Sequence, residues 1–190
     1  MTLIHAGACM TGSFCTFKKA FDAWRSLKNA GFELLPIMSE AAYSTDTRFY
    51  PSEASRKIFS EIAGREIITT IRETEPIGPK NLTDITIVMP CTGNTLSKIA
   101  NGIVDTPVSM AVKSTLRNNK PILIAVSSND ALGIGAKNLG ALLSMKNIFF
   151  VPFGQDDPQM KPTSLVAKFD LVTEAALAAL EGKQLQPILM

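Results

Sequence analysis

Residues 84–102 of the chain read DITIVMPCTGNTLSKIANG. The opening run, Asp84–Met89, is nearly all β-branched or apolar and is followed by Pro90, which is typical of a strand buried on both faces of a parallel sheet. A helix is predicted directly afterwards, from about Asn94 to Ile103. A buried strand that leads into a helix is the repeating unit of an α/β fold.

Short apolar runs alternate with amphipathic runs on both sides of this stretch. Apolar spacing and capping residues predict helices over 17–27 (followed by Gly31), 53–63 (between Ser52 and Gly64), 108–117 (after Pro107), 138–145 and 164–180. Apolar runs predict strands over 32–38, 121–126 and 148–153, an edge strand over 67–71, and a weak first strand over 2–9. There is no low-complexity linker and no fixed-period repeat, so we expect a single domain over residues 1–190, with a parallel sheet wrapped by helices.

The composition excludes several classes of function. Hydrophobic residues make up 46% of the chain and charged residues 19%, with 19 Lys and Arg against 17 Asp and Glu. A net charge of +2 gives no field that would recruit nucleic acid or an anionic membrane. No apolar run is long enough for a membrane span and no basic segment precedes Lys18, so we expect a cytoplasmic protein without a signal peptide. The low charge content also suggests that other subunits cover part of the surface.

The cysteines and the single histidine narrow the possible chemistry. Cys9, Cys15 and Cys91 have no CxxC spacing, which indicates neither a disulfide framework nor a metal site. Catalysis by a Ser-His-Asp or Cys-His arrangement would have to use His5. Cys91 precedes a predicted helix N-terminus, where a thiol pKa can fall, so it is a candidate nucleophile; the alternative is a buried packing residue. Cys9 and Cys15 are expected in the core.

Small polar residues follow each predicted strand, at 11–13, 39, 91–95, 127–130 and 154–157. Ligands of open α/β sheets bind beyond the carboxyl ends of the strands, and hydroxyls at helix N-termini suit a phosphate. Simple N-capping is the alternative role for each loop. A P-loop is absent, and Asn138 stands where a dinucleotide motif starting at Gly133 would need its third glycine. The pattern leaves open a mononucleotide site.

Residues 90–102, PCTGNTLSKIANG, resemble the asparagine motif of the homo-oligomeric flavin-containing cysteine decarboxylase family of flavoproteins. The resemblance extends over about residues 10–188, through 45–49 (TDTRF), 75–80 (EPIGPK), 116–119 (LRNN), 129–133 (NDALG) and 152–158 (PFGQDDP). It implies a flavodoxin-like, Rossmann-like three-layer α/β/α fold. It also implies FMN bound at a subunit interface and a homo-oligomer, a trimer or a multiple of trimers.

The same resemblance implies roles for individual residues. Gly12 and Ser13 match the turn that meets the flavin phosphate, and Ser39 matches a second phosphate-side loop. The other implied flavin contacts are Thr92, Asn94 and Thr95 in the asparagine motif, Ser109 and Met110 on the following helix, and Ser127 and Asn129 on the next loop. Asn94 and Cys91 are the candidate catalytic residues.

The chain departs from the decarboxylases of this family in one respect. They use a histidine before the asparagine motif, and residues 72–84 contain none, which disfavours cysteine decarboxylation. The branch that the whole chain resembles implies instead an oxidoreductase subunit that acts with a dehydrogenase-like partner on a small dicarboxylate. The hydride acceptor would be FMN, or NAD(P) held by the partner.

A dicarboxylate needs fixed cations, and the candidates are Arg48, Lys80, Lys98, Lys113 and Arg117, with Arg48 and Lys80 ranked first. Two alternatives to the oxidoreductase subunit stay open. One is a non-catalytic scaffold subunit on the flavoprotein fold, and the other is another FMN-dependent decarboxylase or transferase of the same family.

Overall fold

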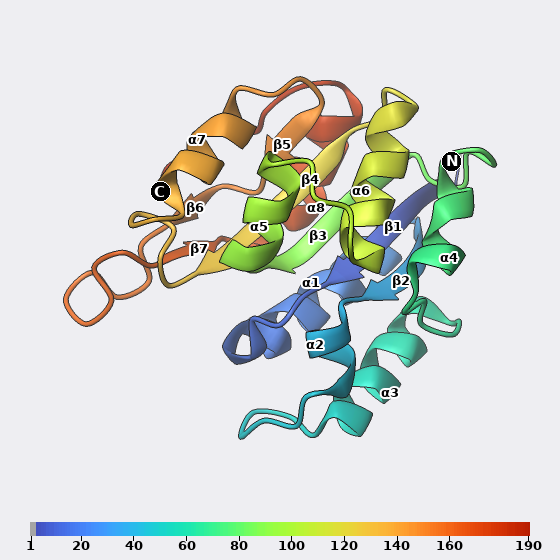
Figure 1. Cartoon of the computed structure of the whole chain (residues 1–190), viewed down its shortest axis with the longest axis horizontal. Helices are drawn as coiled ribbons and strands as arrows, with labels where there is room; N and C mark the ends of the chain where they lie inside the picture. Colours follow the sequence, from blue (N-terminus) through green and yellow to red (C-terminus); the bar gives the residue numbers. More distant parts are fainter. Residues whose placement is uncertain (1–2) are drawn as a thin grey trace.

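The computed structural model describes residues 3–190 and contains a seven-stranded sheet between two layers of helices (Figure 1). The four long strands are β1 (Ile4–Met10), β2 (Phe32–Met38), β3 (Ile85–Cys91) and β4 (Ile122–Ser128), and they pair in parallel in the order β2-β1-β3-β4. The short strand β5 (Ile148–Phe150) continues this parallel order beside the first half of β4. The order 2-1-3-4-5 is that of flavodoxin-like sheets, so the predicted fold class is confirmed.

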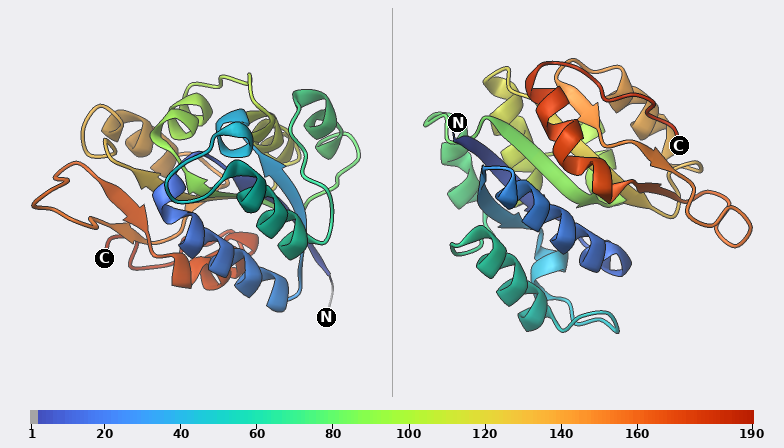
Figure 2. Two further views of the ribbon diagram at one scale, coloured as in Figure 1. Left: turned by 90° about the horizontal axis from the view of Figure 1, so that it is seen from below. Right: turned by 180° about the vertical axis from the view of Figure 1, so that it is seen from behind.

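Helices cover both faces of the sheet. One face packs against α5 (Gly93–Ala100), α6 (Pro107–Arg117) and α7 (Ala136–Leu143), which lie in front in Figure 1. The other packs against α1 (Phe17–Asn29), α3 (Ser52–Ala63) and α8 (Val172–Leu180); α1 and α8 lie in front in the right-hand view of Figure 2. The remaining helical segments are short: η1 (Phe14–Thr16), α2 (Glu40–Ser44), α4 (Ile71–Thr74), η2 (Glu75–Ile77) and η3 (Phe169–Leu171).

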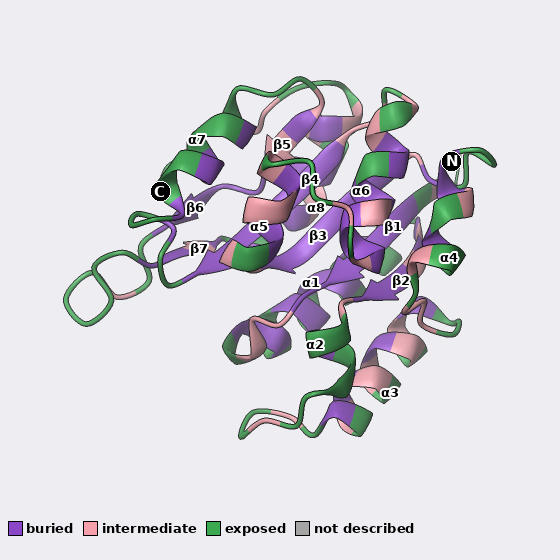
Figure 3. Ribbon diagram, in the orientation of Figure 1, coloured by how far each residue is buried: buried purple, intermediate pink, exposed green. Residues whose placement is uncertain are grey.

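The central strands are buried on both faces, as their composition predicts. Every residue of β3 and of β4 is buried, which Figure 3 shows as continuous purple arrows. In β3, Ile87 and Met89 pack into the layer of α1 and α8, whereas Val88 faces α5 and α6, as the two-residue period of a strand requires. Cys91 also packs on the α5 and α6 side, because the register of β3 shifts between Val88 and Cys91. β3 thus lies in the middle of two cores.

The sheet ends in an antiparallel hairpin that the sequence does not predict. Strands β6 (Phe153–Gly154) and β7 (Leu165–Ala167) pair with each other, and β7 pairs with the last two residues of β4. Since β5 reaches only Ile122–Ile124, the end of β4 would otherwise be an open edge with unpaired backbone groups. The predicted helix over 164–180 is therefore wrong in its first part, and α8 begins only at Val172.

Other predicted boundaries also change. The predicted strand over 148–153 divides into β5 and β6, because Pro152 has no N–H to donate to a ladder. The weak strand predicted over 2–9 is β1 (Ile4–Met10), which lies within the sheet and is paired on both sides; Thr2 lies outside the described residues. The predicted edge strand over 67–71 is reduced to one bridge between Ile37 and Ile68. Helix α3 starts at Ser52 itself and ends at Ala63; Gly64 follows, and its φ of 75° is the left-handed conformation expected of a stop glycine.

Charged residues gather at the amino ends of the strands, at the opposite edge from the loops singled out above. His5 Nδ1 lies 3.1 Å from a carboxylate oxygen of Glu33. Asp84 accepts a hydrogen bond from the His5 backbone N–H (2.9 Å) and pairs with Lys120 Nζ (3.2 Å). Burial acts to raise the pKa of Asp84, but these two contacts outweigh it and hold the pKa below its ordinary value. The single histidine therefore belongs to a polar cluster remote from those loops.

None of the helices within residues 3–190 has both the length and the apolar character needed to cross a bilayer.

Candidate functional site

The carboxyl ends of the four long parallel strands bring the small polar loops into one row. Ser39 follows β2, Gly12 and Ser13 follow β1, Thr92 follows β3, and Asn129 follows β4. Neighbouring strands are about 4.8 Å apart, so the row spans roughly 14 Å from β2 to β4. The chain leaves β1 towards β2 and leaves β3 towards β4, so the topological switch point lies between β1 and β3.

A cavity of about 450 Å³, the strand-end cavity, opens at this point. Five of the predicted flavin contacts line it, namely Gly12, Ser13, Thr92, Ser127 and Asn129. The rest of its lining is formed by Cys15, Thr16 and Lys19 of the β1–α1 segment, Gly93, Ser128 and Asp130 at the ends of β3 and β4, and Asp156, Lys161 and Val166 of the β6–β7 segment. Residues far apart in the chain thus contribute hydroxyls, a glycine and charged groups to one hollow.

Hydroxyl groups connect the walls of the strand-end cavity. The Ser13 and Ser127 hydroxyl oxygens are 2.7 Å apart, and Thr16 Oγ1 lies 3.4 Å from the same Ser127 oxygen. The buried Thr11 hydroxyl donates to the Pro90 carbonyl (2.7 Å) and accepts from the Thr92 N–H (3.0 Å). Thr11 therefore fixes the loop after β1 against the loop after β3.

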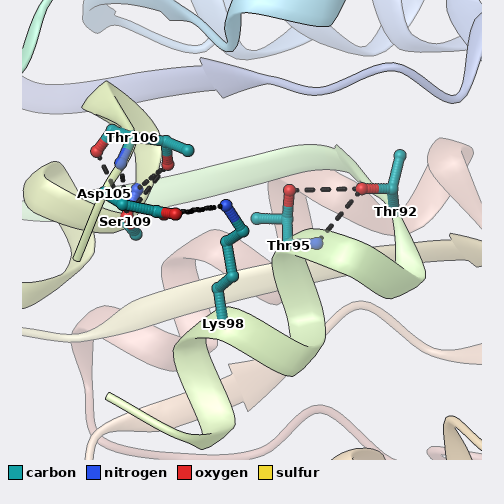
Figure 4. Close-up of polar contacts among 6 residues, drawn as sticks. All are labelled: Thr92, Thr95, Lys98, Asp105, Thr106 and Ser109. Carbon is teal, nitrogen blue, oxygen red and sulfur yellow. Dashed lines mark hydrogen bonds and ion pairs between the residues drawn. The ribbon is translucent and has the colours of Figure 1, made fainter. Parts of the chain in front are cut away.

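The asparagine motif forms the N-terminus of α5. Thr92 caps this helix: its hydroxyl accepts from the Thr95 N–H (3.3 Å) and donates to the Thr95 hydroxyl (3.2 Å), as Figure 4 shows. Gly93 lies so close to the end of β4 that a Cβ built there would stand 2.6 Å from Ser128 Oγ and 2.8 Å from Asp130 Oδ1. Only glycine leaves room for these two polar groups beside the motif.

Other predicted flavin contacts lie outside this cavity in the single chain. Ser39 caps α2 by accepting from the Ala42 N–H, at the β2 side of the row. Ser109 is buried and forms a capping box with Thr106 at the start of α6 (Figure 4). Asn94 is exposed, and among residues 3–190 its side chain has no hydrogen-bond partner within reach; Met110 is half-buried. Their contact with a flavin stays a prediction.

The five predicted substrate cations are dispersed. Lys98 forms a two-oxygen ion pair with Asp105, at 2.8 Å to each oxygen (Figure 4). Lys98 and Lys113 line a second, mainly apolar cavity of about 390 Å³ between α5 and α6. The Arg48 guanidinium stacks over the Phe49 ring at 4.9 Å, and Lys80 and Arg117 are exposed. None of the five lines the strand-end cavity.

The cysteines differ from expectation in one case. Cys9 and Cys91 are fully buried, and burial raises the pKa of both thiols. Cys91 is thus held as a neutral thiol, which fits the packing alternative rather than a nucleophile. Cys15, expected in the core, is exposed and lines the strand-end cavity, because η1 turns it outward before α1 begins.

Sequence reasoning missed Lys19 and Lys161 as members of this site, and it indicated Asp156 only as part of the loop at 154–157. Lys19 follows Lys18 on α1, and nothing in the sequence distinguishes the two. Lys161 and Asp156 reach the cavity only because β7 pairs with β4, and the sequence pattern in that segment is equally compatible with a helix. The run Gly154–Asp157 at a strand end was the available signal for this side of the cavity.

The donor set suits a flavin mononucleotide. Hydroxyls of Ser13, Ser39 and Thr92 with helix N-termini are groups that bind a phosphate. The strand-end cavity of about 450 Å³ lies within the size range of small-molecule sites. The β1/β3 switch point is also where flavodoxin-like sheets hold FMN. The residues present therefore fit FMN.

The chain belongs to the flavoprotein family, to which residues 2–180 match. Within it, the chain is 46% identical over 184 residues to the B subunit of dipicolinate synthase from Bacillus subtilis (strain 168), covering 97% of this chain and 92% of that protein. It is also similar to the crystal structure of the B subunit of dipicolinate synthase from Bacillus halodurans, with a TM-score of 0.90, 41% identity, and coverage of 98% and 96% of the two chains.

More distant solved structures share the fold. One is the dodecameric FMN-dependent UbiX-like decarboxylase from Escherichia coli O157:H7, with a TM-score of 0.62, 23% identity, and coverage of 78% of this chain and 80% of that one. At this identity the likeness shows the fold alone. The resemblance expected from the asparagine motif is confirmed, and the family match over residues 2–180 includes the first strand.

Proposed function

We propose that this protein is the flavin-binding B-type subunit of a dipicolinate synthase. With a dehydrogenase-like A subunit, it would oxidise a dihydrodipicolinate-type precursor to dipicolinate in the mother cell of a spore-forming bacterium. The observation that carries the proposal is the strand-end cavity at the β1/β3 switch point, whose hydroxyl-rich lining includes five implied flavin contacts. The 46% identity to a B-type chain of dipicolinate synthase over 97% of this chain supports it.

The reaction removes two hydrogens and makes the ring aromatic, so the protein's main task is to position an acceptor beside the substrate. When bound, FMN supplies a hydride acceptor. The chain's own residues would bind and orient it: the loop of Gly12 and Ser13, with Ser39, would hold the phosphate, and residues of the asparagine motif would contact the flavin. Asn94, at the exposed start of α5, would hold the substrate beside the ring with its side-chain amide.

Two arrangements of the hydride acceptor are compatible with this site. Either FMN accepts the hydride in this protein, or NAD(P) accepts it in the A subunit while this protein binds the substrate. Reconstitution with FMN distinguishes them. The purified protein should take up one FMN per chain and turn yellow, and turnover with the A subunit should require that FMN. Flavin-free protein that supports full turnover would contradict the flavin-dependent reaction.

A non-catalytic scaffold subunit is the second candidate, and the absence of a histidine from residues 72–84 favours it. An Asn94→Ala variant separates the two. The catalytic proposal expects a loss of turnover of tenfold or more, on the order of a lost hydrogen bond to a charged group. Full activity of Asn94→Ala, or full activity of the A subunit alone, would support the scaffold.

The family resemblance also supports a homo-oligomer, a trimer or a multiple of trimers, in which a neighbouring subunit completes the flavin site. Asn94 is exposed in the single chain, as a residue facing a neighbour would be. Native mass spectrometry of the FMN-loaded protein measures both the number of chains and the flavin content. A monomeric holoprotein would refute the shared site.

A further inference from the structure

The asparagine motif and the start of α6 both carry implied flavin contacts, and an ion pair joins these two segments. Lys98 of α5 contacts both carboxylate oxygens of Asp105, at 2.8 Å to each, and Asp105 precedes the N-cap of α6 (Figure 4). We propose that Lys98 and Asp105 are positioning residues of the flavin site. This inference rests on the proposed function, and it gives Lys98 a role other than the substrate cation expected from the sequence.

On α5, Lys98 lies on the same side as the implied flavin contacts of the asparagine motif. It follows Asn94 by four residues and Thr95 by three, and these spacings place side chains on one face of a helix. Thr92 fixes the start of the same helix, because its hydroxyl accepts from the Thr95 N–H. A contact at Lys98 therefore acts on the face of α5 that the flavin is expected to meet.

At the other end of the ion pair, Asp105 adjoins a compact hydrogen-bonded turn. The Thr106 N–H donates to the Ser109 hydroxyl (3.1 Å), and the Ser109 N–H donates to the Thr106 hydroxyl (3.1 Å). Ser109 is buried, and Met110 follows it on α6. Because Asp105 directly precedes this turn, the position of Asp105 also determines where both implied flavin contacts of α6 lie.

Apolar packing alone leaves the alignment of α5 and α6 incomplete. Ile99 and Val112 belong to one core, but both also line the cavity of about 390 Å³ that lies between the two helices. Among residues 3–190, the ion pair is the only hydrogen-bonded or ionic contact between α5 and residues 104–109. Apolar contacts are non-directional, whereas a contact with both carboxylate oxygens has a defined geometry. The ion pair therefore sets the relative position of the two segments.

The burial of the pair favours a positioning role over substrate binding. The Lys98 side chain is 21% exposed, so its ammonium group is shielded from water and the pair is less screened than an exposed one. Asp105 already offsets this charge through both of its oxygens. A substrate carboxylate would have to displace Asp105 before it could bind Lys98.

The test compares the full-length FMN-loaded wild type with Lys98→Met, Asp105→Asn and the double variant. Both single changes nearly keep the side-chain size and remove the ion pair. Each should weaken FMN binding about fivefold, shift the flavin absorption maximum and lower turnover with the A subunit about tenfold. The double variant should be no worse than either single variant, since the two residues act through one contact. Losses that multiply in the double variant would contradict the pair.

Two matched variants separate positioning from a general loss of stability. Lys98→Arg can keep two hydrogen bonds to Asp105 and should keep the wild-type spectrum and turnover. Lys120→Met removes another ion pair, with Asp84 at the amino ends of the strands, in which the lysine is also 21% exposed. It should lower the urea midpoint but leave the FMN affinity and the absorption maximum unchanged. If Lys120→Met shifts the spectrum as Lys98→Met does, or if Lys98→Arg behaves like Lys98→Met, the positioning role is wrong.

The substrate-cation role predicts a different pattern. An ammonium group that holds the substrate would gain from the loss of its carboxylate partner, so Asp105→Asn would tighten dipicolinate binding while Lys98→Met would weaken it. The positioning role predicts that neither change tightens it. Calorimetric titration of dipicolinate into the FMN-loaded proteins measures both signs. Opposite signs would assign Lys98 to the substrate and overturn the proposal.

FMN uptake by the wild type tests the proposed function without reference to the ion pair. If the wild type takes up FMN, and the variants match it in FMN affinity, absorption maximum and turnover, only the positioning role fails. If the wild type takes up no FMN, the proposed flavin-dependent function fails, and the positioning role fails with it.

Discussion

Replacing Thr11 by valine should separate the two loops that meet at the switch point. Thr11 is 1% exposed, and its hydroxyl accepts a hydrogen bond from the Thr92 N–H and donates one to the Pro90 carbonyl. Valine has nearly the same shape, so no cavity forms. The Pro90 carbonyl keeps the backbone N–H of residue 11 as a donor (3.3 Å), but the Thr92 N–H loses its partner.

The energetic effect follows from that orphaned donor. An unsatisfied buried hydrogen-bonding group costs about 1–3 kcal/mol, and the partial burial of Thr92 favours the lower end, so we expect a loss of about 1–2 kcal/mol. In a domain of this size that lowers the Tm by roughly 2–8 °C. FMN affinity should fall as well, because the loop after β1 and the start of α5 no longer keep a fixed separation.

Urea unfolding measures the first effect and flavin fluorescence titration the second. Thr11→Ser keeps the hydroxyl but removes one buried methyl group, so its stability should fall by about 1 kcal/mol while its FMN affinity stays close to that of the wild type. A valine variant with unchanged stability and unchanged FMN affinity would refute the role of this hydroxyl. A serine variant that loses as much FMN affinity as valine would refute it too, since the methyl group would then be the important part.

Three further predictions concern the thiols, the pH dependence and the core. In native protein a thiol reagent should label Cys15 alone, and in denatured protein all three cysteines, because burial keeps Cys9 and Cys91 protonated and inaccessible; FMN should slow the labelling of Cys15. The lowered pKa of Asp84 contributes stability that is present above the ordinary carboxyl pKa of about 4 and is lost as pH falls through the folded-state value. Urea midpoints from pH 7 to pH 3 should therefore drop less for Asp84→Asn than for the wild type, and parallel curves would contradict this. Trp24→Ala should lower the free energy of unfolding by about 3–5 kcal/mol, since Trp24 is completely buried against Phe59, and a loss below 1 kcal/mol would show that the core relaxes around the change.

Most of the sheet could be predicted from local pattern. The strands at 85–91 and 122–128 are apolar or β-branched along most of their length, because both of their faces are buried. The strand at 32–38 is mainly apolar as well, with the half-buried Glu33 near its start. The first strand, IHAGACM, is less recognisable since small residues replace branched ones. Gly7 shows the reason: a Cβ there would stand 2.7 Å from the Thr86 hydroxyl on the neighbouring strand. The small residues of the first strand are therefore explained by close packing against the neighbouring strand and not by strand propensity.

Part of the candidate site could also be predicted, because of the way in which parallel strands end. Gly12, Ser13, Thr92, Ser127 and Asn129 follow strands that the sequence already indicates, and parallel strands bring their carboxyl ends to one edge. A residue that directly follows a parallel strand can therefore be assigned to this edge as soon as the strand itself is predicted.

The amino-acid sequence alone determined the parallel core, the edge at which ligands bind and the flavoprotein asparagine motif, because each depends on residues that are close in the chain. Only the tertiary structure decided which charges reach the cavity. Lys19 is next to Lys18 in sequence, yet only Lys19 lines the cavity. Lys161 arrives there through the antiparallel pairing of Val166 with Ser127. Such pairing joins segments about forty residues apart. It is stabilised because β7 covers the otherwise unpaired backbone groups at the end of β4, and the local sequence around Lys161 carries no sign of that contact.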